Sequence, residues 1–454
     1  MHRVTILVLF FLSGMAALIY QVTWVRQSTL VFGVSVYAYS AVLTAFMGGS
    51  ALGSFLIRRR ADQTPEPLRL YALLQFGIAP LALATPFALS ALLPVYAQIA
   101  QALPANKLLL TLLRLGLALL VLTPTTLLIG ATLPVMARTY AKTAGRVGGD
   151  VGRLFAADTL GAALGCLLAG LWLIRLLGTR QTVWVGVGLT LVAGLGAWWL
   201  ARGKRQPSDT TDPLQPKERP SPGPPRMRSA PAVGHLPFTL RHSTFTILIA
   251  YGLSGFTALG YEVVWSRILA VFTLNAVFSF AIMLSTFLVG LALGGWIGAR
   301  WLRARPAEWA SFGRLQLALA LSALVTLYVF WLVPNRVTLE TVLGQYSVTK
   351  LILYEFLLGF LTLLLPATLF GLLFPVAASL YTKEQTSAVG QQIGQLNAIN
   401  TAGAVCGSLA AGFLLIPWCG LQWTTLLLSV LNLGIGGLAY WLAQPAGKAQ
   451  WGAP

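Results

Sequence analysis

The sequence has little charge and few of the side chains that catalyse reactions or bind metals. Only 9% of its 454 residues are charged, whereas soluble domains carry about 25%. Its histidines all fall in expected tail or linker segments: His2, His235 and His242. Its cysteines show no metal-ligand spacing and are interpreted as small packing residues: Cys166, Cys406 and Cys419. We therefore expect no catalytic residues, no metal ion and no cofactor.

Apolar length is what the sequence has in abundance, since 57% of its residues are hydrophobic. A helix needs about 20 apolar residues to cross a bilayer. Twelve such spans are predicted: 5–25, 33–57, 69–90, 108–136, 154–174, 182–200, 244–265, 276–298, 314–334, 351–379, 394–417 and 423–443. We expect an all-α, polytopic membrane protein whose main partner is the lipid bilayer. Prolines in two spans predict kinks, at which neighbouring helices satisfy the freed carbonyls.

The net charge of +19 would favour nucleic-acid binding in a soluble protein. Here the basic residues alternate between loops. With the N-terminus inside, 23 lysines and arginines lie in cytoplasmic segments and seven lie on the opposite side. This bias follows the positive-inside rule and predicts cytoplasmic N- and C-termini. Membrane topology therefore accounts for the charge, and no nucleic-acid partner is expected.

The chain repeats itself at an offset of 241 or 242 residues. We predict a first six-helix repeat at 1–201 and a second at 243–445, followed by a short cytoplasmic tail at 446–454. Residues 202–242 contain nine prolines and predict a disordered basic linker. Because each repeat has an even number of spans, both begin on the same side, which is the parallel layout of the major facilitator architecture.

Three paired motifs carry a family resemblance. They are SGMAALIYQVTWVR and SGFTALGYEVVWSR, GGSALGS and GLALGG, and LFAADTLGAALG and LNAINTAGAVCG. Together they resemble the membrane domain of bacterial fused major-facilitator/spermidine-synthase proteins. The resemblance implies a location in the bacterial inner membrane and chemistry related to polyamines. Only QPAGKAQWGAP follows the last span, so the aminopropyltransferase domain of the fused relatives is not expected here.

Ionisable groups inside apolar spans are costly and therefore informative. Asp158, Glu262 and Glu355 are the acids in such places, and Arg114 is the base. Arg114 and Glu355 come from corresponding spans and are candidates for an intramembrane ion pair, either structural or part of a gate. Asp158, with Asn400 in the matching segment, is a candidate for substrate binding.

The segments YQVTWVR and YEVVWSR predict a second candidate group. An aromatic belt with interface cations would explain Tyr20, Trp24, Tyr261, Trp265, Arg26 and Arg267. It does not explain Gln21 and Glu262, which lie one helical turn before a tryptophan. Glu262 between two aromatics would suit an organic cation. It would equally suit a structural pair with Arg26 or Arg267, and both interpretations stay open.

The remaining motifs predict packing. GRVGGDVG superficially resembles a cofactor loop, but its twin SAVGQQIG lacks the acid, which favours a repeated helix entry. The glycine-rich strings predict close helix contacts. For function we expect a permease for a small metabolite, with a polyamine-type cation suggested by the resemblance. The alternative is a non-transporting membrane partner of a separately encoded aminopropyltransferase or another cytoplasmic enzyme, and catalysis by this chain itself ranks last.

Overall fold

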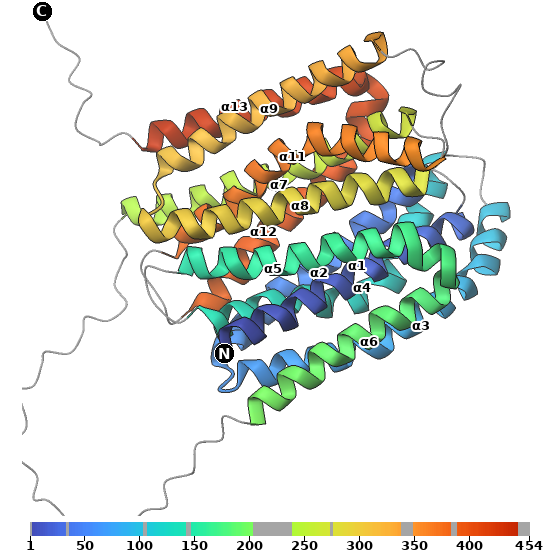
Figure 1. The fold of residues 1–454 in the computed structure, drawn as a ribbon, viewed down its shortest axis with the longest axis horizontal. Coiled ribbons are helices and arrows are strands. Elements are labelled where there is room, and N and C mark those ends of the chain that lie inside the picture. Colours follow the sequence, from blue (N-terminus) through green and yellow to red (C-terminus); the bar gives the residue numbers. More distant parts are fainter. Residues whose placement is uncertain are drawn as a thin grey trace, which may run out of the picture.

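A computed structural model describes residues 2–32, 36–102, 107–141, 147–202, 238–272, 276–336, 348–382 and 388–443. These residues form twelve α-helices (Figure 1). They are α1 (His2–Phe32), α2 (Val36–Gln63), α3 (Pro67–Ala102), α4 (Lys107–Tyr140), α5 (Val147–Leu167), α6 (Ile174–Arg202), α7 (Phe238–Phe272), α8 (Ala276–Ala304), α9 (Trp309–Arg336), α11 (Val348–Tyr381), α12 (Val389–Leu409) and α13 (Ile416–Leu442). The prediction of an all-α polytopic fold is confirmed.

The helices pair in the same way in both repeats. In the first repeat α1 packs on α5, α2 on α4 and α3 on α6, and in the second α7 packs on α12, α8 on α11 and α9 on α13. The α3/α6 and α9/α13 pairs form opposite edges of the bundle (Figure 1). The repeats meet along two seams, α5 against α8 and α2 against α12.

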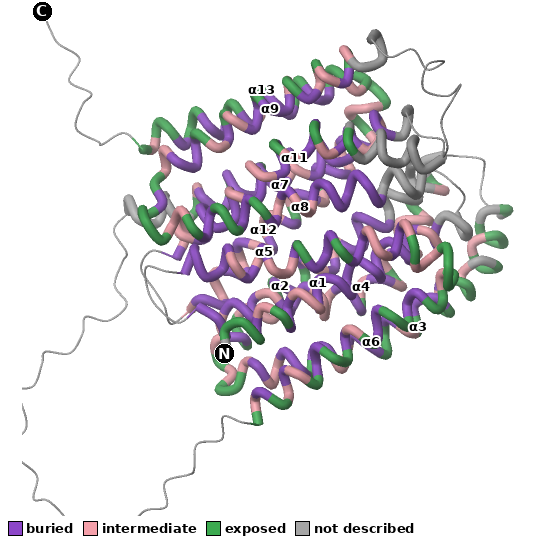
Figure 2. The backbone as a smooth tube through the Cα atoms, viewed as in Figure 1, coloured by how far each residue is buried: buried purple, intermediate pink, exposed green. Residues whose placement is uncertain are grey.

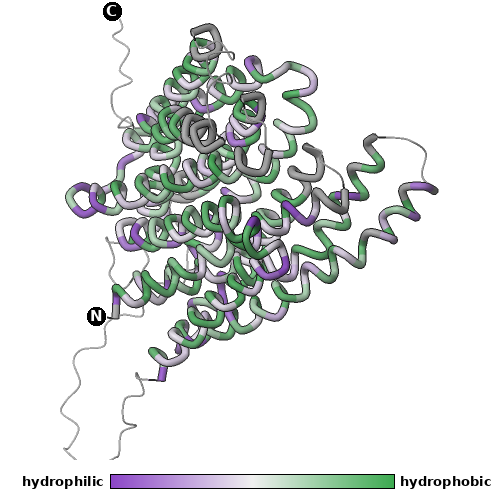
Figure 3. Tube along the Cα trace, turned by 45° about the vertical axis from the view of Figure 1, so that its right-hand side comes forward, coloured by the Kyte–Doolittle hydropathy of each residue, from purple (hydrophilic) through white to green (hydrophobic). Residues whose placement is uncertain are grey.

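Burial follows this arrangement. The central helices α1, α5, α7 and α8 are mostly buried, whereas the edge helices carry many exposed positions (Figure 2). Hydrophobic residues cover the length of the helices, and hydrophilic ones gather towards their ends (Figure 3). By length and composition, nine stretches of the described residues qualify as membrane spans, and two of them contain a helix pair. Exposed apolar side chains on the edge helices are the surface that lipid would cover.

One end of the bundle carries most of the arginines of the described helices, and we call it the basic end. It contains the start of α1, the ends of α2 and α8, and the arginines Arg58, Arg59, Arg60, Arg138, Arg300 and Arg303. The end of α6 lies there as well (Figure 1).

Prolines inside α4 and α11 free carbonyls that neighbouring helices satisfy. Pro134 cannot donate to the Gly130 carbonyl, which instead accepts a 2.7 Å hydrogen bond from Ser54 Oγ of α2. Pro366 likewise frees the Thr362 carbonyl, which accepts from Thr326 Oγ1 of α9 at 3.0 Å. The predicted satisfaction by neighbours is confirmed at these two sites.

A reversal of direction occurs at matching glycines in the two repeats. Short π-helical segments, Leu168–Leu173 and Ala410–Leu415, continue α5 and α12. The chain then turns at Gly178 and Gly420, whose φ angles are 80° and 78°. A side chain is strongly disfavoured in that conformation, so both copies of the turn require glycine.

Each of the twelve predicted spans overlaps one of these helices. The predicted linker, 202–242, extends too far at its C-terminal end, because α7 begins at Phe238. The helix begins with FTLRH, which mixes apolar and polar residues and therefore lacks the continuous apolar run by which the spans were predicted. Residues 203–237 and the predicted tail lie outside the described residues.

Candidate functional site

The two tyrosine–tryptophan pairs lie inside the bundle. Tyr20 stacks on Trp24 with ring centroids 5.6 Å apart, and Tyr261 stacks on Trp265 at 5.2 Å. All four side chains are at most 1% exposed. The aromatic-belt interpretation is therefore wrong for these residues, because a belt residue must reach the membrane surface.

Neighbouring helices hold each pair in place. The Tyr20 hydroxyl shares a 2.9 Å hydrogen bond with Thr190 of α6. In the second repeat the Tyr261 hydroxyl makes the same contact with Ser429 of α13, also at 2.9 Å. Phe287 packs against Trp265 as Phe46 packs against Trp24. These rings are therefore a packed frame that fixes the adjacent polar positions, Gln21 and Glu262.

Gln21 and Glu262 are buried polar groups, 1% and 4% exposed. No described residue accepts a hydrogen bond from Nε2 of Gln21. The Glu262 carboxylate interacts electrostatically with the Cys166 thiol of α5, which itself contacts the Ala281 carbonyl of α8 at the seam between the repeats. Within the described part of the chain it forms no hydrogen bond and no ion pair, including with Arg26 or Arg267. The structural-pair interpretation of Glu262 is therefore not supported by the geometry.

An ionised carboxylate in such a place is unfavourable unless a proton or a cation accompanies it. Glu262 therefore has the environment of a group that binds a cationic ligand or a proton. Gln21, its counterpart at an offset of 241, offers a neutral amide in the same setting.

Asp158 and Asn400 occupy matching positions in the two repeats. Each packs against a glycine of the first helix of its repeat, Gly14 in α1 and Gly255 in α7. A side chain at Gly14 would collide with the Asp158 backbone carbonyl and would come within 2.7 Å of its Oδ1. A side chain at Gly255 would meet Asn400 in the same way. Asn400 Nδ2 donates to the Tyr251 carbonyl at 2.8 Å. The close helix packing predicted for the glycine-rich strings is confirmed at Gly161 and Gly403, where an added side chain would collide with backbone of α1 and α7.

Asp158 faces a different direction from Glu262. Its carboxylate lies near the Tyr71 hydroxyl of α3, within the first repeat. The described residues provide it with neither a hydrogen bond nor an ion pair. The candidate binding residues thus divide into an α1/α5 group around Asp158 and an α7 group at the seam around Glu262.

Arg114 makes a contact that the sequence did not predict. Its Nε donates to the Tyr96 hydroxyl at 3.0 Å, and its Cζ lies 5.7 Å from the Tyr96 ring centroid. The side chain of Glu355 lies outside the described residues. The Arg114–Glu355 ion pair therefore stays a prediction.

A polar contact closes the seam between α2 and α12 at the basic end. Asp62 accepts hydrogen bonds from the backbone amides of Gly390 at 2.9 Å and Gln391 at 2.6 Å. Arg138 Nε lies 3.6 Å from Asp62 Oδ1. About two turns earlier on α2, Ser54 Oγ accepts a hydrogen bond from Asn397 Nδ2 at 2.9 Å. These bonds join the first repeat to the second.

Sequence reasoning missed Asp62, although two signals pointed to it. It is the one acid in the stretch RRRADQ, and SAVGQQIG supplies a helix start whose amides need an acceptor. The helix-entry prediction for both glycine motifs is confirmed, since α5 begins at Val147 and α12 at Val389. In the first copy Asp150 lies 3.7 Å from Arg3, an ion pair within the repeat.

No cluster of three histidine, cysteine or acidic side chains occurs among the residues that the structure describes. Cys166 is buried, and Cys406 and Cys419 are exposed; all three are free thiols.

Comparison with known proteins gives structural relatives only. No protein-family model and no curated protein matches the chain. Solved structures with a similar fold include the human organic anion transporter MFSD10 (TETRAN), at 16% identity and a TM-score of 0.55, covering 96% of this chain and 99% of that one. A bacterial homologue of the iron transporter ferroportin in an outward-facing state gives 14% identity, a TM-score of 0.56 and coverages of 96% and 97%.

The fucose:proton symporter FucP of E. coli gives a TM-score of 0.58 at 13% identity, with 98% of both chains covered. At such low identity the likeness establishes the fold. The chain therefore shares the fold of these solved structures, and its function has to be argued from its own residues.

Proposed function

We propose that the chain is a permease that carries a small organic cation across the membrane by alternating access. The observation that carries the proposal is the buried carboxylate of Glu262 at the seam between the repeats, without a hydrogen bond or ion pair among the described residues. Binding a cation removes the cost of burying that charge. The Asp62 contact then acts as the closure at the basic end.

The substrate class that we propose is a polyamine-type cation. Two observations support it: Asp158 and Glu262 both offer carboxylates in the interior, and the paired motifs resemble those of the fused spermidine-synthase proteins. Ammonium groups pair with carboxylates in a site of this kind. A role as the membrane partner of a separate aminopropyltransferase remains the alternative outcome of the test.

The test is uptake of labelled spermidine by the purified full chain in liposomes. Glu262→Gln should lower uptake by about tenfold or more, because a charge-assisted hydrogen bond is lost. Folding should survive, since Gln21 occupies the equivalent position. Glu308→Gln, the same change at an exposed residue, is the control and should leave uptake unchanged. Uptake equal to empty liposomes would reject the polyamine permease.

A further inference from the structure

Trp198, near the end of α6, contacts two arginines. The Cζ atom of Arg69 on α3 is 5.1 Å from the Trp198 ring centroid, and that of Arg202 on α6 is 5.5 Å from it. Both distances are within the range of cation–π contact. The group lies at the basic end on the α3/α6 edge, which faces away from the other repeat (Figure 1).

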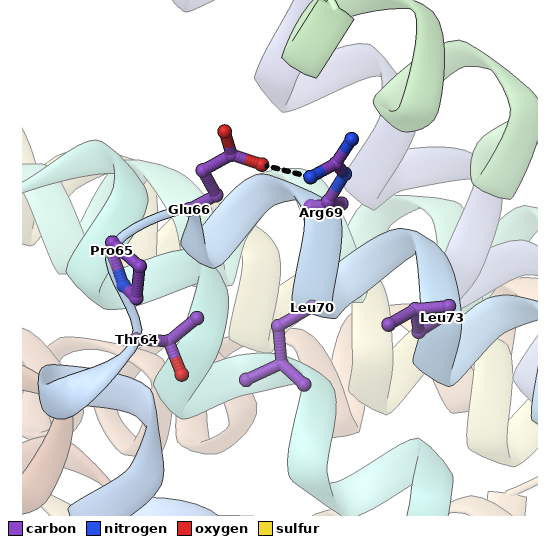
Figure 4. A pocket seen from close by; sticks show the side chains of 6 residues that line it. All are labelled: Thr64, Pro65, Glu66, Arg69, Leu70 and Leu73. Atoms are coloured by element: carbon purple, nitrogen blue, oxygen red, sulfur yellow. Dashed lines mark ion pairs between the residues drawn. The ribbon is translucent and has the colours of Figure 1, made fainter.

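The positive charges around Trp198 outnumber the negative charges among the described residues. Arg69 Nη1 pairs with Glu66 Oε2 at 2.9 Å (Figure 4), and Arg202 is exposed. Of these two guanidinium groups, only that of Arg69 has a carboxylate partner among the described residues. Since Glu66 engages one nitrogen of Arg69, further N–H donors of both arginines can contact a second anion.

An apolar surface continues from this charged group along the helices. An open depression of about 390 Å³ is lined by Thr64, Pro65, Glu66, Arg69, Leu70 and Leu73 (Figure 4). Leu73 is 54% exposed, and Trp199, beside Trp198, is 75% exposed. An anionic group bound by the arginines would therefore lie beside an apolar surface on which an acyl chain could pack.

The second repeat lacks the arrangement. At the offset that relates Gln75 to Gln316, Ala310 replaces Arg69. At the offset that relates Gly178 to Gly420, Tyr440 replaces Trp198 and Gln444 replaces Arg202. The fold is built in that repeat without the two arginines, so they are not a requirement of helix packing.

We propose that Arg69, Arg202 and Trp198 bind the phosphate of an anionic phospholipid whose acyl chain lies over Leu70 and Leu73. Guanidinium groups match phosphate oxygens with two parallel N–H donors. Tryptophan is favoured at the headgroup level of the bilayer, where one end of the ring is wet. A free phosphate would use the arginines but would gain nothing from the leucines.

The test uses the purified full chain in detergent, titrated with phosphatidylglycerol while the unfolding temperature is followed. The wild type should be stabilised by this lipid and not by phosphatidylcholine or inorganic phosphate. The double variant Arg69→Ala/Arg202→Ala should bind phosphatidylglycerol roughly thirtyfold more weakly, since both basic contacts are lost.

Arg59→Ala/Arg60→Ala removes the same charge from exposed positions on α2 and should respond like the wild type. Equal responses of the two double variants would overturn the proposal, and so would equal stabilisation by inorganic phosphate. If the Arg69/Arg202 variant does not fold, Arg202→Gln alone replaces it, because glutamine is the residue of the second repeat. Arg202→Gln with undiminished lipid binding would also overturn the assignment.

Discussion

One missing methyl group sets the distance between α1 and α5. Gly14 lies directly against the Asp158 backbone, and the same contact recurs between Gly255 and Asn400. This contact places the side chain of Asp158 beside Gly14 and that of Asn400 beside Gly255. The glycines therefore position candidate binding residues as well as packing the helices.

Gly14→Ala should destabilise the protein, since the new methyl group collides with backbone that cannot move alone. A loss of about 1–3 kcal/mol is expected for such overpacking. Thermal unfolding in detergent measures it. Gly48→Ala is the matched control, because no atom lies within 4 Å of the added methyl group; its unfolding temperature should be unchanged or slightly higher. An equal effect of both changes would contradict the close-contact explanation.

The start of α12 depends on a side chain from the other repeat. The first amides of a helix have no partner within it, and Asp62 of α2 supplies acceptors for Gly390 and Gln391. An N-terminal carboxylate also interacts favourably with the helix dipole. Helix capping and the contact between repeats are thus one interaction in this protein.

Asp62→Ala should expose the amides of Gly390 and Gln391. Capping contributes about 1 kcal/mol, so hydrogen exchange at these amides should accelerate roughly fivefold. The amides of Gly148 and Gly149, at the start of α5, serve as the internal control because Asp62 does not contact them. Uniform acceleration at both helix starts would indicate general loosening and contradict a specific cap.

The helices could be predicted from the sequence, whereas the contacts between residues far apart in the chain could not. Apolar length predicted the spans, and the motifs shared at offsets of 241 and 242 residues predicted two six-helix repeats. The burial of Trp24 was not predictable, because a tryptophan near a span end suits both an interface and a core. The contact of Asp62 with Gly390 spans 328 residues of sequence, so no local pattern indicates it.

The two repeats should have the same orientation in the membrane. Arg59 and Arg300 are exposed and related by the offset of 241. In a chain whose native cysteines are replaced by alanine, Arg59→Cys and Arg300→Cys should both react with an impermeant maleimide from the cytoplasmic side only. Labelling from opposite sides would show that the two repeats are inverted relative to each other, which would contradict the predicted parallel repeat.

The backbone of the bundle is nearly twofold symmetric, yet its interior charges are not. The first repeat carries an amide at Gln21 and an acid at Asp158, whereas the second carries an acid at Glu262 and an amide at Asn400. A half-turn that superposes one repeat on the other therefore exchanges acid for amide at both pairs of positions. An elongated ligand with chemically different ends would therefore have one preferred orientation between the repeats. The helices around it would not select that orientation, because they pair in the same way in both repeats.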